Sequence, residues 1–134
     1  MKDKLISENF SGKIITDYPH NKHWKDKFHG IHYTSSNIHY YDPKHSTSNY
    51  LHSASCHTIT DINLCNKKLF DYILLSPILE SHNSFSELGW SKFSDLCLES
   101  YSPTLALGGL SLNLSDYRTC KENYGFGIAG IRKI

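Results

Sequence analysis

The chain has 134 residues, 39% hydrophobic and 20% charged, which is enough to bury one core and leaves room for a single domain, residues 1–134. Its formal net charge of +1 argues against the clustered basic face that non-specific nucleic-acid binding needs. No apolar secretory segment or amphipathic membrane stripe is present, and the four cysteines lack CxxC spacing. We therefore expect reduced thiols, a cytoplasmic location, and neither nucleic acid nor a membrane as partner.

Short apolar segments alternate with polar or helical ones along the chain, a pattern typical of βα units. The apolar runs in the second half are too short for a helix and too continuous for a half-exposed strand, which predicts strands buried on both faces of a parallel sheet. The expected strands are Lys13–Thr16, Gly30–Tyr33, Leu51–Ser55, Tyr72–Ser76, Thr104–Leu107 and Gly127–Gly130.

Helical spacing of apolar residues predicts three helices between the later strands. The first carries Ile59, Ile62, Cys65 and Leu69, with Thr58 or Thr60 as N-cap. The other two are expected over about 86–99 and about 113–122. The connection 20–28 is polar and only weakly helical, and 37–49 is interpreted as a loop with at most one helical turn.

Six parallel strands with intervening helices predict an α/β fold, a partial (β/α)8 TIM barrel. A closed barrel needs eight strands and typically about 250 residues. We therefore expect an open barrel in which Lys13–Thr16 and Gly127–Gly130 are edge strands, each unpaired on one side.

Glycines follow two of the expected strands. Gly108 and Gly109 come after the fifth strand, and Gly130 stands at the end of the sixth. Bare backbone amides at such strand ends can cradle a phosphate group. The alternative is that these glycines merely permit tight turns.

Several motifs stand together in a recognisable order. They are Gly12–Asp17, Gly30-Ile31-His32-Tyr33, Ser55-Cys56-His57, Asp71–Ile78, Ala106–Gly109 and Gly127–Gly130. On these motifs the chain, from about Phe10 onward, resembles thiamine phosphate synthase and its thiazole tautomerase (TenI) relatives. The resemblance begins at what would be the third strand of the family's barrel, so the expected strands correspond to strands three to eight.

The resemblance implies a role in thiamine biosynthesis. The family's synthases join an aminopyrimidine methyl pyrophosphate to a thiazole phosphate and release pyrophosphate with the help of Mg²⁺. The tautomerase relatives instead rearrange a thiazole carboxylate phosphate. The implied partners are phosphorylated thiazole and pyrimidine substrates, and a separate amino-terminal fragment or a second copy of the chain is expected to cover the open barrel edges.

The resemblance also implies a set of substrate-phosphate-binding residues. They are Ser55, Ser81, Gly108, Gly109, Gly130, Ile131 and Arg132. Arg132 stands where the family usually has a small serine, and its guanidinium can add a bidentate phosphate contact. Asp17 matches an aspartate near the Mg²⁺. Ser84 replaces a lysine that neutralises pyrophosphate, and the family's second aspartate falls at about Asn37.

His57 is the candidate catalytic residue, because it matches the histidine that moves the proton in the tautomerases and an imidazole titrates near neutral pH. A Cys56–His57 dyad is not expected, since adjacent strand residues point to opposite faces. His32 is expected to support the structure. The histidines expected in solvent are His20, His23, His29, His39, His45, His52 and His82. No third ligand stands at metal spacing from His20/His23 or His29/His32, so no zinc site is expected.

Three functions follow from these observations. The chain is a thiamine phosphate synthase-like transferase, a tautomerase-like isomerase that uses His57, or an inactive truncated relative that binds a phosphorylated ligand. The missing strands, Ser84 and Asn37 all weaken the pyrophosphate half of the site, so activity of this chain alone stays open.

Overall fold

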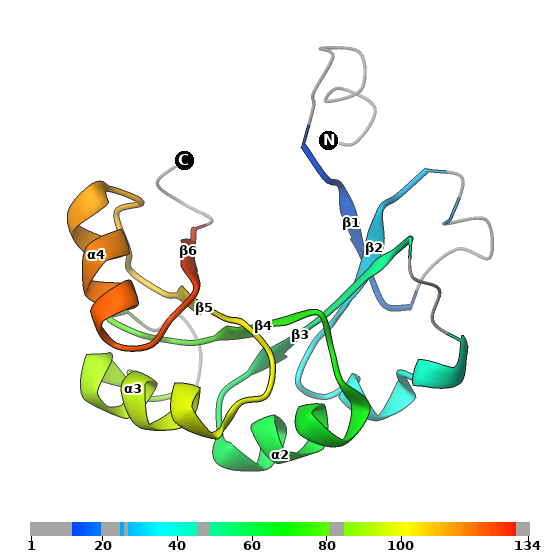
Figure 1. Cartoon of the computed structure of the whole chain (residues 1–134), viewed down its shortest axis with the longest axis horizontal. Helices are drawn as coiled ribbons and strands as arrows, with labels where there is room; N and C mark the ends of the chain where they lie inside the picture. The colour runs from blue at the N-terminus through cyan, green and yellow to red at the C-terminus, as the bar shows by residue number, and fades with distance from the viewer. Residues whose placement is uncertain (1–11, 20–24, 26, 46–48, 81–84, 131–134) are drawn as a thin grey trace.

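The computed structural model describes residues 12–19, 25, 27–45, 49–80 and 85–130. Within them, six parallel strands form one sheet in the order β1-β2-β3-β4-β5-β6. Their bounds are β1 Ile15–Asp17, β2 Gly30–Tyr33, β3 Leu51–Cys56, β4 Tyr72–Leu75, β5 Thr104–Leu107 and β6 Gly127–Ala129. Figure 1 shows the sheet as an open curve with β1 and β6 at its two ends. The predicted partial barrel of six parallel strands is confirmed.

The three predicted helices lie on the convex side of this curve (Figure 1). Their bounds are α2 Ile59–Lys68, α3 Gly89–Glu99 and α4 Leu114–Glu122. The side chains of Thr58 and Asn113 cap α2 and α4 by accepting hydrogen bonds from the backbone amides of Asp61 and Asp116, respectively. Of the two expected caps for α2, Thr58 is therefore the one used.

The helix α3 begins later than the sequence predicts. The amides of Leu88 and Gly89 donate to the carbonyls of Pro77 and Ile78, at 2.7 and 2.9 Å. These bonds hold the residues before Gly89 against the segment that follows β4. The chain therefore enters α3 only at Gly89 and not near residue 86.

The β2–β3 connection contains two short 3₁₀ turns, η2 Ile38–Tyr40 and η3 Pro43–His45, where the sequence predicts at most one helical turn. From α2, the Lys68 ammonium donates to the carbonyls of His39 and Tyr41, at 3.0 and 2.6 Å. These hydrogen bonds hold η2 against α2. The local sequence predicts only a polar loop here, because Lys68, which stabilises the turn, lies far away in the sequence.

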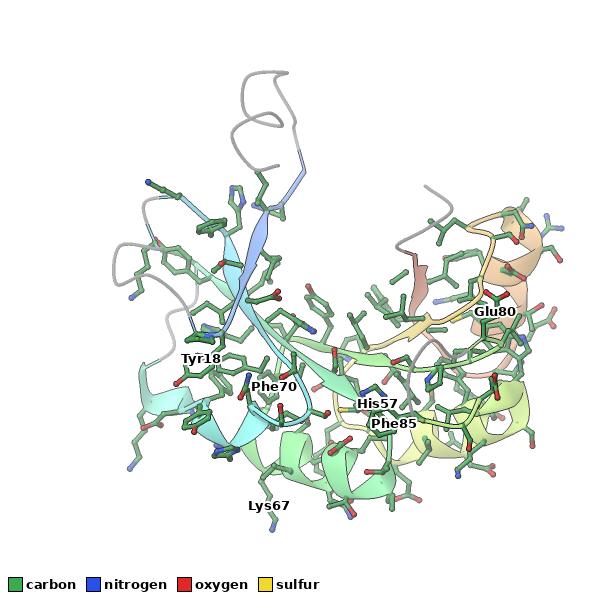
Figure 2. All side chains as sticks on the ribbon, turned by 180° about the vertical axis from the view of Figure 1, so that it is seen from behind. Tyr18, His57, Lys67, Phe70, Glu80 and Phe85 are labelled. Atoms are coloured by element: carbon green, nitrogen blue, oxygen red, sulfur yellow. The ribbon has the colours of Figure 1, made fainter. Side chains whose placement is uncertain are left out.

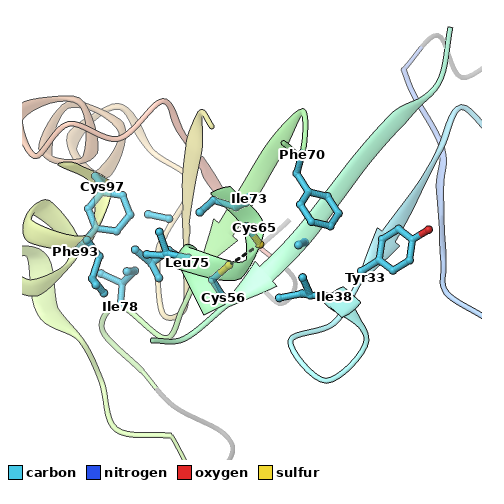
Figure 3. Close-up of a cluster of buried hydrophobic side chains, with 14 of the residues drawn as sticks. Tyr33, Ile38, Cys56, Cys65, Phe70, Ile73, Leu75, Ile78, Phe93 and Cys97 are labelled. Atoms are coloured by element: carbon cyan, nitrogen blue, oxygen red, sulfur yellow. Dashed lines mark hydrogen bonds between the residues drawn. The ribbon is translucent and has the colours of Figure 1, made fainter. Parts of the chain in front are cut away.

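The main core fills the space between the sheet and the helices. Every second residue of β3, β4 and β5 points into it, including Cys56, Leu75 and Ala106, which have no exposed surface. Phe93 of α3 is equally buried. Figure 3 shows this cluster and the pair of thiols at its centre, where the Sγ atoms of Cys56 and Cys65 lie 3.5 Å apart. All four cysteines are free and buried.

Aromatic rings extend the core over the β2 side of the sheet. Tyr18 stacks on both Tyr33 and Tyr40, with ring centroids 5.2 and 5.1 Å apart. Burial, together with the neighbouring tyrosines, raises the pKa of Tyr33 to about 12. The expectation that His52 is solvated is wrong: its side chain is buried and stacks on Tyr41, with centroids 4.7 Å apart. Strand alternation points it toward the core side although its neighbours are polar.

The concave face of the sheet is only half buried, so the prediction of strands buried on both faces is wrong. Leu74, Leu105 and Leu107 point to this face and keep part of their surface exposed. The helices cover the opposite face, and the open curve does not bring enough strands together to enclose this one. A half-buried apolar surface therefore lines the inside of the curve.

Gly30 should be the most sensitive glycine of the sheet. A Cβ there would collide with the backbone carbonyl of Leu51 on β3. This carbonyl cannot move away, because the pairing of β2 with β3 holds it in place. We expect Gly30→Ala to lower the free energy of unfolding by about 1–3 kcal/mol or more, as overpacking does. Urea denaturation measures this. Gly127→Ala is the matched control, because its Cβ would meet only the flexible end of Leu105, 3.1 Å away. Equal effects of the two substitutions would contradict the close approach.

Candidate functional site

Parallel strands bring their carboxyl ends to one edge of the sheet, where barrel enzymes build their sites. Asp17 ends β1, and His57 directly follows β3. Ser76 follows β4, and Gly108 and Gly130 follow β5 and β6. Residues that are far apart in the sequence therefore share this edge, as the sequence predicts.

A polar cluster lies on the concave face just below that edge. The imidazole of His32 on β2 is within hydrogen-bond distance of two β3 hydroxyls: Nδ1 is 2.8 Å from Ser53 Oγ, and Nε2 is 2.7 Å from Ser55 Oγ. The parallel register explains this, because it sets His32 beside Ser53 and β3 alternation returns Ser55 to the same face. His32 thus has the supporting contacts that were expected of it.

The electrostatics of the cluster favour a neutral imidazole. Burial lowers the pKa of His32, and the nearby charge of Asp17 opposes this shift without reversing it. Asp17 stands beside His32 in the β1–β2 register and is exposed. A neutral ring can donate from only one nitrogen and must accept at the other.

His57 is held at the carboxyl edge by contacts from three directions. Its Nδ1 lies 2.8 Å from the carbonyl oxygen of Ser76, and its backbone amide donates to the Asp61 carboxylate at 2.9 Å. Its ring stacks on Phe85, with centroids 3.9 Å apart and planes inclined by 15° (Figure 2). A carbonyl only accepts, so Nδ1 carries the proton, and Nε2 of the neutral ring is left with a lone pair that can take one.

The glycine pair after β5 packs tightly against the segment that follows β4. Both glycines have positive φ, +120° and +74°. A Cβ on Gly108 would lie 2.8 Å from the amide nitrogen of Ile78, and one on Gly109 would lie 2.8 Å from Glu80. These contacts require glycine whether or not a phosphate binds. They also put an acidic residue, labelled in Figure 2, beside the expected phosphate cradle.

Gly130 also sits under a side chain, since a Cβ there would lie 2.8 Å from Leu112. Leu112 itself has a positive φ of 52°. Ser81, Ser84, Ile131 and Arg132 lie outside the described residues, and their expected roles stay predictions.

A magnesium site built by the protein alone does not fit the described residues. They contain no group of three or more His, Cys, Asp or Glu side chains that could hold a metal ion. Asp17 is the one carboxylate at the expected place, and both ring nitrogens of neighbouring His32 are engaged by serines. Asn37 lies at the start of the η2 turn. Mg²⁺ at Asp17 would depend on oxygens supplied by a substrate.

Three contributors to this site escaped sequence reasoning. Ser53 was hidden in a strand interpreted as buried, although the alternation of Ser53 and Ser55 was a signal for a polar face. Phe85 and Glu80 lie in a loop, and only the tertiary structure shows that they contact His57 and Gly109.

Comparison with known proteins identifies relatives in fold only. No family model matches the sequence, and no curated protein matches it. Among solved structures, thiamine phosphate pyrophosphorylase from Pyrococcus furiosus is similar with a TM-score of 0.71 and 15% sequence identity. FabK from Thermotoga maritima is similar with a TM-score of 0.74 and 10% identity.

These matches cover nearly all of this chain and only part of each neighbour. The chain is covered to 96% and spans 61% of the Pyrococcus protein; for FabK the shares are 97% and 45%. At such identities the likeness concerns the fold alone, and it supports a fold like that of thiamine phosphate synthase.

Within the part of the chain that the structure describes, none of the helices has the length and the apolar character that a membrane span requires.

The lowered pKa of His32 predicts a pH dependence of stability. The unfolded chain binds this proton more readily than the folded one, so the contribution is present above the ordinary pKa of about 6.5 and is lost as the pH falls below it. We expect the free energy of unfolding to fall between pH 7.5 and pH 5, and to fall less in His32→Gln. Urea titrations at both pH values measure the difference.

The variant His39→Gln, at an exposed position, is the matched control for this comparison. If His32→Gln and the parent lose the same free energy on acidification, the neutral state of His32 is not what the folded protein prefers.

Proposed function

We propose that this chain is a thiamine phosphate synthase-like protein that binds a phosphorylated thiazole at the carboxyl edge of its sheet. The observation that supports the proposal is the order in which polar, apolar and glycine-rich regions follow one another across the concave face. The polar cluster of His32, Ser53 and Ser55 stands at one side. Half-buried leucines follow across β4 and β5, and the glycine turn of Gly108 and Gly109 stands beyond them.

This order suits a small aromatic ring that carries a phosphate group. The strand register places Ser55 beside Leu74, and Leu74 beside Leu105, so the apolar side chains adjoin the polar cluster directly. An apolar floor with a few fixed polar groups is the usual composition of a small-molecule site. The proposed contacts of the substrates' phosphate groups are Ser55 at the polar cluster and the amides at Gly108, Gly109 and Gly130 at the far side, with Ser81, Ile131 and Arg132 as further proposed contacts.

A second candidate function is a tautomerase-like isomerisation, and the contacts of His57 favour it. Because the Ser76 carbonyl fixes the proton on Nδ1, Nε2 of the same ring can accept a proton from a bound thiazole. Proton movement at one base needs no stabilisation of a leaving pyrophosphate. An inactive phosphate-binding relative is the third candidate.

The synthase reaction makes larger demands on charge. Mg²⁺ would be held by Asp17 together with diphosphate oxygens, and it would supply positive charge to the leaving group. Ser84 offers no such charge in the place of the family's lysine, and Glu80 adds a negative charge next to Gly109. We further propose that the 134 residues act as one domain whose edge strands are covered by a separate segment or a second copy.

Removing the charge of Glu80 should tighten phosphate binding. We expect Glu80→Gln to bind thiazole phosphate a few-fold more tightly than the parent chain in isothermal titration calorimetry. The interaction between two solvent-exposed charges is typically worth about 0.2–1 kcal/mol, and here it is a repulsion between the carboxylate and the phosphate. Glu99→Gln, at the end of α3, is the matched control for the lost charge. If neither Glu80→Gln nor the parent binds thiazole phosphate, the phosphate cradle is wrong. Binding by both with equal affinity would move the phosphate away from Gly109.

Synthase turnover by this chain should be very slow or absent. With Mg²⁺ and both substrates saturating, we expect thiamine phosphate to form far more slowly than about 1 s⁻¹, because the missing charges act on the transition state. A discontinuous assay measures the product, with the Pyrococcus furiosus pyrophosphorylase as positive control. A rate of about 1 s⁻¹ or faster would show that the chain needs neither a lysine at position 84 nor a second aspartate.

A further inference from the structure

Ser53 is the one member of the concave cluster of His32, Ser53 and Ser55 for which the sequence predicts no role. Its side chain is 1% exposed. Among the described residues its hydroxyl has a single hydrogen-bond partner, Nδ1 of His32 at 2.8 Å. Ser55 likewise meets only Nε2 of the same ring, at 2.7 Å, but it remains half buried. One imidazole therefore joins a buried hydroxyl to a partly exposed one.

The direction of these two hydrogen bonds follows from the burial of Ser53. If Nδ1 carried the proton, Ser53 would accept it, and the proton of its own hydroxyl would be left in the protein interior without an acceptor. A buried donor without a partner is costly, whereas a hydroxyl oxygen with a spare lone pair costs less. Ser53 therefore donates to Nδ1, and the proton of the neutral ring sits on Nε2.

The consequence reaches Ser55 on the other side of the ring. With the ring proton on Nε2, Ser55 Oγ accepts from His32, and its own O–H is free to point toward the concave face. A hydroxyl oriented in this way is a donor suited to an anion such as a phosphate ester. In the opposite tautomer, Ser55 would spend its proton on the imidazole and present only lone pairs, which repel an anion.

We infer that Ser53 is a positioning residue that fixes the Nε2–H tautomer of His32 and thereby turns the Ser55 hydroxyl into a hydrogen-bond donor for an anionic ligand. The ligand class rests on the proposed function. The tautomer does not, since it is a property of the ligand-free protein. The low pKa of His32 agrees with a ring that stays neutral near pH 7.5, with Asp17 as the charged group beside it.

The test is ¹⁵N NMR of the full chain with labelled histidine at pH 7.5, without ligand. The protonated and bare ring nitrogens have well-separated shifts, so the spectrum gives the tautomer directly. We expect His32 as Nε2–H in the parent and in Ser55→Ala, a mixture in Ser53→Ala, and recovery of Nε2–H in Ser53→Thr, which keeps the hydroxyl. His32 is assigned from its absence in His32→Gln.

A parent that is mainly Nδ1–H would overturn the inference, as would a Ser53→Ala spectrum identical to that of the parent. If Ser53→Ala does not fold, Ser53→Thr and Ser55→Ala still test the inference, because it requires Nε2–H in both, and Nδ1–H in either variant would contradict it. Titration with thiazole phosphate is the second measurement. We expect Ser55→Ala to weaken binding about tenfold and Ser53→Ala several-fold. Absence of binding by the parent would count against the proposed function and leave the tautomer result standing.

Discussion

Parallel pairing of β2 with β3 fixes the positions of the polar side chains His32, Ser53 and Ser55 on the concave face. In this register Gly30 stands opposite Leu51, whose backbone comes so close that no Cβ fits on Gly30, and His32 stands opposite Ser53. A slip by one residue would send His32 to the convex side and bring Ile31 to the concave one. The same pairing thus places the His32 ring between two hydroxyls and keeps the apolar side chains in the core.

The two faces of the sheet divide the work between stability and recognition. The convex face carries the packed side chains of the core, with Phe93, Ile73 and Leu75 fully buried. The concave face carries the polar cluster of His32, Ser53 and Ser55 and a half-buried apolar surface. Because little of the core depends on the concave side chains, substitutions there should alter binding more than folding. The glycines are the exception, since the backbones themselves meet at these positions.

Periodicity and turn chemistry were enough to predict the architecture. Short apolar runs between polar or small-residue segments located all six described strands, and the spacing of Ile62 and Cys65 located α2. Long-range contacts could not be predicted in this way. Nothing in the local sequence indicates that Lys68 would hold the turn at Ile38–Tyr40, or that Tyr41 would bury His52. For the site, the sequence located His57 and the glycine turns, but it did not show that Glu80 and Phe85 lie against them.

The two thiols behind His57 have a chemical consequence of their own. Cys56 is the last residue of β3 and directly precedes His57. Cys65 of α2 faces Cys56, and at most 1% of either residue is exposed. The hydrogen bond to Cys65 and burial raise the pKa of Cys56 far above that of a free thiol. Alkylating reagents attack thiolates, so in the folded chain Cys56 is inert not by geometry alone but by protonation. Alkylation of Cys56 therefore requires β3 and α2 to separate locally. The rate of alkylation measures how often the structure opens next to the site.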